Sequence, residues 1–117
     1  MKKIILATIF SALAMPALAQ RAQVEDYYSE IWCTENGGTQ EVYTDAGTRA
    51  DCVFSDLVVE VDFDNKWAEG LGQALHYSVE FDRPGAVLLI LQNHNGDDRQ
   101  RYTDRLQSTI DSLCLRI

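Results

Sequence analysis

Apolar positions along the chain fall into two kinds of repeat, which together predict a mixture of helices and strands. Three segments carry apolar side chains at three- and four-residue spacing, the pattern of helices that pack along one face: residues 22–35, 66–81 and 97–113. Four shorter runs, bounded by turn residues, predict strands: 40–44, 48–54, 57–63 and 86–91. The predicted order is α-β-β-β-α-β-α, and a short strand in the apolar last residues would add a final β.

The connections between the predicted strands indicate a mixed sheet. The turn Asp45-Ala46-Gly47 joins strands 40–44 and 48–54, so these two form an antiparallel hairpin. Residues 86–91 are continuously apolar, as expected of a strand covered on both faces, and they follow a helical crossover from strand 57–63. Such a crossover favours a parallel, right-handed connection. We therefore expect a single compact α/β domain with a mixed β-sheet flanked by helices.

The first 19 residues have the pattern of a secretory signal. Lys2 and Lys3 precede the apolar run 4–13, Pro16 ends that run, and Ala17-Leu18-Ala19 is a small-x-small cleavage site. The run is shorter than the roughly 20 apolar residues that span a bilayer. We expect a signal peptide over 1–19, with a single domain over 20–117 that is periplasmic or secreted and has no membrane attachment after cleavage. An uncleaved anchor is the alternative.

Charge and cysteine content agree with an exported domain. The chain has 18 acidic and 10 basic residues, a net charge of -8, and loss of Lys2 and Lys3 would make it 8 − 18 = -10. This balance argues against a long nucleic-acid footprint, which needs clustered basic side chains. In an oxidising compartment one disulfide is expected, and Cys33–Cys52 is the favoured pair, with Cys114 in the apolar C-terminal end as a buried thiol.

Three carboxylates are the candidate chemistry. Strand alternation places Glu60 and Asp62 on one face of strand 57–63. On the preceding strand, the side chain of Asp51 is on the opposite face from those of Ala50 and Cys52. If Cys52 joins the core, Asp51 can face Glu60. Hard oxygen ligands of this kind suit Mg²⁺ or Mn²⁺. The alternative is a solvated acidic face balanced by Arg49.

The helix that follows adds a polar stripe close to these carboxylates. The stripe consists of Lys66, Glu69, Gln73 and either His76 or Tyr77. Lys66 begins it four residues after Asp62 and could supply a positive group, while an ordinary exposed helix face is the alternative. Inside the same helix, Gly70 and Gly72 predict close packing against a neighbour.

An ordered set of motifs resembles the PD-(D/E)XK nuclease superfamily, which has the restriction-endonuclease-like fold. The resemblance covers most of residues 30–95, and the motifs that carry it are 49–52 (Arg-Ala-Asp-Cys), 59–63 (Val-Glu-Val-Asp-Phe), 66–69 (Lys-Trp-Ala-Glu) and 72–77 (Gly-Gln-Ala-Leu-His-Tyr). They also look like a group of small uncharacterised bacterial proteins related to that superfamily. The resemblance implies that Asp51 and Glu60 are metal ligands, with Asp62 as a third candidate.

The sequence departs from the superfamily pattern at the lysine that follows the glutamate by two residues. Asp62 occupies this position, so Lys66 would have to supply the charge by reaching back about one helical turn, roughly 5 Å. By the same resemblance, Gln73 matches a helix residue found near such sites. The predicted catalytic set is therefore Asp51, Glu60, Lys66 and Gln73.

Two hypotheses for function follow. The first is Mg²⁺- or Mn²⁺-dependent phosphodiester hydrolysis, acting on nucleic acid or a nucleotide, for which Arg99, Arg101 and Arg105 could form a local basic strip. The aspartates among these arginines favour a mixed solvated helix face as the alternative. The second hypothesis is a non-catalytic periplasmic or secreted binding protein on a degenerate nuclease-like scaffold, with an unknown protein partner.

Overall fold

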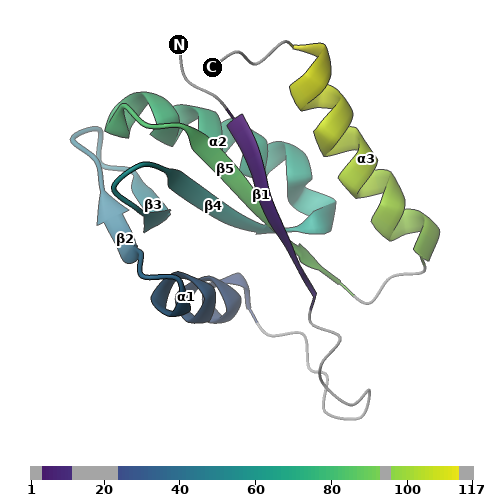
Figure 1. Cartoon of the computed structure of the whole chain (residues 1–117), viewed down its shortest axis with the longest axis horizontal. Helices are drawn as coiled ribbons and strands as arrows, with labels where there is room; N and C mark the ends of the chain where they lie inside the picture. Colours follow the sequence, from purple (N-terminus) through teal and green to yellow (C-terminus); the bar gives the residue numbers. More distant parts are fainter. Residues whose placement is uncertain (1–3, 12–23, 93–95, 114–117) are drawn as a thin grey trace.

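A computed structural model describes residues 4–11, 24–92 and 96–113, and its centre is a mixed sheet of strand order β1-β5-β4-β3-β2 (Figure 1). The strands are β1 (Ile4–Ser11), β2 (Thr39–Tyr43), β3 (Arg49–Val53), β4 (Val58–Phe63) and β5 (Gly85–Leu91). The helices are α1 (Glu25–Glu35), α2 (Trp67–Phe81) and α3 (Gly96–Ser112), and a 3₁₀ turn at Asp64–Lys66 leads into α2. From α1 onward, this order confirms the predicted α-β-β-β-α-β-α succession.

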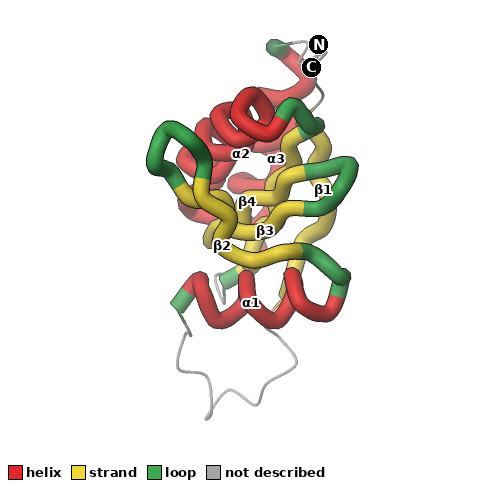
Figure 2. The backbone as a smooth tube through the Cα atoms, turned by 90° about the vertical axis from the view of Figure 1, so that its left-hand side faces the viewer, coloured by secondary structure: helices red, strands yellow, loops and turns green. Residues whose placement is uncertain are grey.

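Strands β2 to β5 form the predicted four-strand mixed sheet. β2 pairs with β3, and β3 with β4, in antiparallel orientation, whereas β4 and β5 are parallel. Helix α1 covers one face of this sheet, and α2 and α3 cover the other (Figure 2). The described part of the chain is therefore a single α/β domain of three layers.

Residues of the predicted signal segment form the remaining strand. β1 lies parallel to β5, with a register that runs from Ile4 opposite Gly85 to Ser11 opposite Leu91. Cleavage after Ala19 stays a prediction, and it would leave β5 at the edge of the sheet. No helix in the described residues is long and apolar enough to cross a membrane. The predicted last strand falls on residues 114–117, which lie outside the described residues.

Each face of the sheet buries its own apolar cluster. On the α1 face, Tyr28 and Cys33 pack against alternate residues of β4 and β5, among them Val61 and Leu88. On the opposite face, Leu71 of α2 and Leu106 of α3 pack against β5. The continuous burial of β5 agrees with its unbroken apolar sequence.

The predicted disulfide between Cys33 and Cys52 is present and ties α1 to β3. Both cysteines are fully buried, and a bridge across a sequence separation of 19 residues stabilises a domain by about 3 kcal/mol in the chain-entropy model. Gly38 passes directly over the bridge, where a Cβ atom would collide with both sulfurs. The bridge is consistent with a secreted protein.

Candidate carboxylate site

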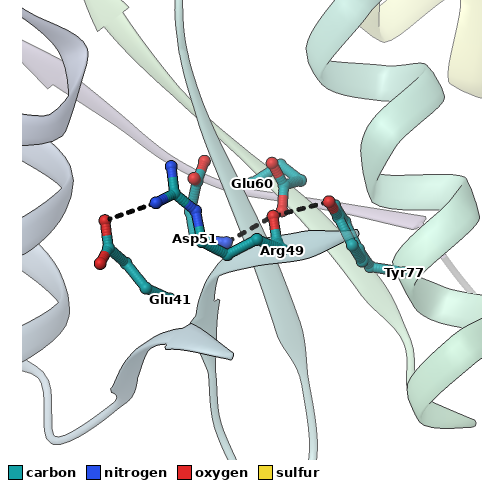
Figure 3. A network of polar contacts seen from close by, with 5 residues as sticks. All are labelled: Glu41, Arg49, Asp51, Glu60 and Tyr77. Carbon is teal, nitrogen blue, oxygen red and sulfur yellow. Dashed lines mark hydrogen bonds and ion pairs between the residues drawn. The ribbon is translucent and has the colours of Figure 1, made fainter. Parts of the chain in front are cut away.

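Strands β3 and β4 separate at Asp51 and Glu60. Within the described chain the two strands pair at Cys52–Val59 and Val53–Val58 and at no further positions. Beyond these pairs, side-chain hydrogen bonds replace the backbone ladder. The Asp51 N–H donates to Glu60 Oε1 at 3.1 Å (Figure 3). The Val61 N–H donates to Asp51 Oδ2 at 2.8 Å. Each carboxyl group is thus held by a backbone amide of the opposite strand.

A local distortion of the β2–β3 hairpin creates this arrangement. The hairpin register omits the Glu41–Asp51 position, and Glu41 has a left-handed φ of 52°. The strict alternation predicted for β3 is wrong here, because Ala50 packs on the α2 side of the sheet while Cys52 packs on the α1 side. The break allows Cys52 to join the core and Asp51 to reach Glu60, as the sequence predicted.

Glu60 and Asp62 lie on the face covered by α2, as the alternation of β4 predicts, and each is only 2% exposed. Helix α2 approaches them closely because Gly70 has no side chain. A Cβ at Gly70 would stand 3.2 Å from Asp62 Cβ and 3.3 Å from Val87 Cγ1. The close packing predicted for Gly70 is thus present, whereas a Cβ at Gly72 would meet nothing within 4 Å.

A fourth carboxyl group, that of Glu25, reaches this site from the first turn of α1. Glu25 is half-buried and hydrogen-bonds the side chain of Asp62. Nothing in the sequence pattern identified it, because it stands far upstream of the motifs and looks like an ordinary acidic residue of a first helical turn. Only the folding of α1 across β4 brings it to Asp62.

Burial raises the pKa of all four carboxyl groups. For Glu60, burial and then the charge and hydrogen bond of Asp51 raise the pKa to about 10. For Glu25, burial and then the hydrogen bond to Asp62 raise the pKa to about 8. Burial is also the main cause of the raised pKa values of Asp51 and Asp62. Glu25 and Glu60 therefore retain their protons at neutral pH, and each is hydrogen-bonded to an aspartate, Glu25 to Asp62 and Glu60 to Asp51.

Of the predicted basic and polar helix residues, Lys66 lies near the carboxylates and Gln73 does not contact them. Lys66 is exposed in the 3₁₀ turn, and its charge partly offsets the burial that raises the pKa values of Asp62 and Glu25. Gln73 is exposed on α2 and forms no hydrogen bond with a described residue.

Tyr77, not His76, is the stripe residue that reaches the site. Its hydroxyl donates to the Arg49 carbonyl at 2.6 Å, beside the Asp51–Glu60 pair (Figure 3). Burial and the nearby Glu60 raise the pKa of Tyr77. His76 instead hydrogen-bonds Thr48 at 2.8 Å. The sequence left these two residues as alternatives, because a helical repeat alone does not separate adjacent positions.

The carboxylate oxygens are suitable ligands for a divalent cation, but they are not arranged around a common metal position. Among the described residues, no group of three or more histidine, cysteine, aspartate or glutamate side chains is arranged to hold a metal ion. Asp51 and Glu60 do fit in one respect. Each has an oxygen fixed by a backbone amide and shares a hydrogen bond with the other carboxyl group. A cation could replace the proton between them.

No family model, curated protein or solved structure matches this chain. The function therefore has to be inferred from the carboxylates and from the surface around them.

Proposed function

We propose that the protein is a Mg²⁺- or Mn²⁺-dependent phosphodiesterase of restriction-endonuclease-like fold, and that Asp51 and Glu60 hold the metal. The observation that carries this proposal is the fixed Asp51–Glu60 pair at the point where β3 and β4 separate. Two backbone amides hold the carboxyl groups in place, so the ligands would need little reorganisation when a cation binds.

The arrangement of the elements supports the fold part of the proposal. An α-β-β-β-α-β succession, with the aspartate on the second strand of the hairpin and the glutamate on the third strand, is what the resemblance requires, and these elements have that order here. The antiparallel, antiparallel, parallel sequence of pairings from β2 to β5 is compatible with it.

The burial of the acids supports the metal part of the proposal. Glu60 and Asp62 are almost fully buried, and burial penalises their ionised forms. A divalent cation supplies the charge that these groups lack, and when bound it polarises a phosphate and lowers the pKa of a water molecule. Asp51 and Glu60 would be the first ligands, and Asp62 the third.

The chain itself would orient the phosphate through Lys66. This lysine is exposed, stands at the end of β4 and already acts on Asp62 through its charge. A flexible ammonium group can contact a phosphate oxygen or hold the attacking water. Gln73 keeps its predicted role only if a bound substrate extends along α2.

One observation favours the second function, a non-catalytic exported binding protein. The carboxyl groups already satisfy one another in the two pairs Asp51–Glu60 and Glu25–Asp62, so the fold needs no metal for its integrity. An acidic domain of this kind would then recognise a basic surface of a protein partner.

Calorimetric titration of Mn²⁺ and Mg²⁺ separates the two functions, together with hydrolysis of a phosphodiester such as bis(p-nitrophenyl) phosphate. The protein purified from expression of the full chain is compared with Asp51→Asn, Glu60→Gln and a matched control, Asp56→Asn, an exposed turn residue. We expect saturable binding and hydrolysis that both site variants lose and the control keeps. Absence of metal binding in the folded protein would overturn the hydrolase proposal.

A further inference from the structure

A second feature lies beside Lys66, in the form of an open groove between the start of α2 and one face of α3. The groove has a volume of about 540 Å³, and its lining includes Trp67, Gln100, Arg101, Asp104 and Arg105. This volume is within the range of pockets that bind small ligands, roughly 300–1,000 Å³. The exposed face of α3 supplies most of the lining. Trp67, which is half-buried and also packs against the apolar cluster of α2, α3 and β5, supplies the aromatic wall.

The topology places this groove at the end of the sheet where Lys66 stands. β4 and β5 are parallel, so α2 and α3, which follow them, begin at the same end of the sheet (Figure 1). Ligands of open α/β sheets bind beyond the carboxyl ends of the parallel strands. Trp67 is the first residue of α2 and directly follows Lys66, whose charge acts on Asp62. A ligand in the groove would therefore extend to Lys66.

The charges of the groove define the size of the ligand. Arg105 forms no ion pair with any described residue, whereas Arg101 pairs with Asp98 at 2.6 Å. Asp97 and Asp104 also line the groove, so its lining holds two acidic and two basic side chains, and Asp104 accepts a hydrogen bond from Gln100 at 2.8 Å. Such mixed charge can accommodate one or a few phosphates, but it would repel the dense charge of a duplex.

The aromatic wall indicates what accompanies the phosphate. An indole ring stacks on an unpaired base of any type, and an arginine alongside it contacts the backbone; this is how single strands are bound without sequence preference. We infer that the groove between Trp67 and α3 binds a short stretch of single-stranded nucleic acid and presents its phosphodiester to the carboxylates. This inference rests on the proposed function and names its substrate class.

Binding of a fluorescein-labelled oligothymidylate, followed by anisotropy in EDTA, tests the groove without the metal chemistry. Arg105→Gln should weaken binding about threefold or more and lower the salt slope by about 0.7, the loss of one phosphate contact. Trp67→Leu, which keeps an apolar side chain, should weaken binding about fivefold or more through lost stacking. Arg49→Gln removes the same charge from β3, where Arg49 pairs with Glu41, and should leave binding unchanged.

Three results would overturn the inference: no binding by the wild-type protein, wild-type affinity of both groove variants, or a duplex bound as tightly as the single strand. The Glu60→Gln variant distinguishes failure of the groove inference from failure of the proposed phosphodiesterase function. If it binds the oligonucleotide in EDTA but cleaves nothing with Mn²⁺, both proposals are supported. If the wild-type protein hydrolyses bis(p-nitrophenyl) phosphate but does not bind the oligonucleotide, only the inference about the groove is contradicted. If it binds the oligonucleotide but hydrolyses nothing, only the proposed hydrolase function is contradicted.

Discussion

Asp51 and Glu60 lie across two strands that have just separated, and the Asp51 amide donates to Glu60 Oε1 at 3.1 Å. In a regular antiparallel ladder this amide would meet a backbone carbonyl. Here a buried acid accepts the hydrogen bond, and the acid is itself in contact with the carboxyl group of Asp51. The strand pair thus exchanges backbone pairing for a fixed pair of carboxyl groups, an arrangement that costs stability unless a proton or a cation lies between them.

Replacement of Glu60 by glutamine should stabilise the protein at pH 8 while abolishing metal binding. A glutamine keeps the Oε1 acceptor for the Asp51 amide and adds a donor for the Asp51 carboxylate. It also removes a group whose pKa burial raises to about 10. We expect a gain of at least about 1.4 kcal/mol, the equivalent of one pKa unit, in the free energy of unfolding by urea. Glu60→Ala is the control, because it leaves the amide unpaired and should cost about 1–3 kcal/mol.

The stability of the metal-free protein should fall as the pH rises from about 5 to 8. Glu25 and Glu60 titrate near 4.5 in the unfolded chain, but burial raises their pKa values to about 8 and about 10 in the folded state. The folded protein therefore holds protons that the unfolded chain has already released. Their stabilising effect is complete below pH 4.5 and is lost as the pH rises through the pKa values of the folded state. The limiting slope is about 1.4 kcal/mol per pH unit for each proton. Urea unfolding at several pH values in EDTA measures this slope, and constant or increasing stability over this window would show that Glu25 and Glu60 are ionised in the folded protein.

Binding of Mn²⁺ should release protons. The carboxyl groups hold protons at neutral pH, and a metal ligand has to be deprotonated. Titrations in two buffers of different ionisation enthalpy give the number of protons released, which we expect to lie between about one and two at pH 7, with an affinity that rises with pH. An affinity independent of both pH and buffer would place the cation elsewhere on this acidic domain.

The sequence predicted the elements and the central carboxylates because these depend on local patterns. Helical spacing, strand alternation and turn residues gave the element order, and β4 places Glu60 and Asp62 on one face as its period requires. Glu25 could not be predicted, because its approach to Asp62 depends on how α1 crosses the sheet. The break in alternation at Asp51 depends on the left-handed backbone of Glu41, which a non-glycine residue rarely adopts. β1 falls within a segment whose composition indicates an export signal, so its pairing with β5 was not anticipated.

Reduction of the Cys33–Cys52 bridge should lower the free energy of unfolding by about 3 kcal/mol, the chain-entropy value for a loop of this length. The measurement is urea unfolding with and without dithiothreitol. A Cys114→Ala variant should show the same loss, because it retains the bridged pair. An equal loss in a Cys33→Ala/Cys52→Ala double variant under oxidising conditions would assign the effect to this bridge, whereas wild-type stability of that variant would contradict it.

Gly70 and Gly72 are two residues apart in α2 but have different surroundings, and the contrast between them offers the sharpest test of the packing around Asp62. Gly70→Ala would place a Cβ 3.2 Å from Asp62 Cβ and 3.3 Å from Val87 Cγ1, so α2 has to move away from β4 and β5. Crowding of this kind costs about 1–3 kcal/mol, and we expect metal binding to weaken as Asp62 shifts. Gly72→Ala is the matched control: its Cβ would meet nothing within 4 Å, and alanine should stabilise the helix by roughly 0.5–1 kcal/mol. Thermal unfolding and Mn²⁺ titration of both variants measure the contrast, and equal behaviour of the two would show that α2 does not rest on Asp62.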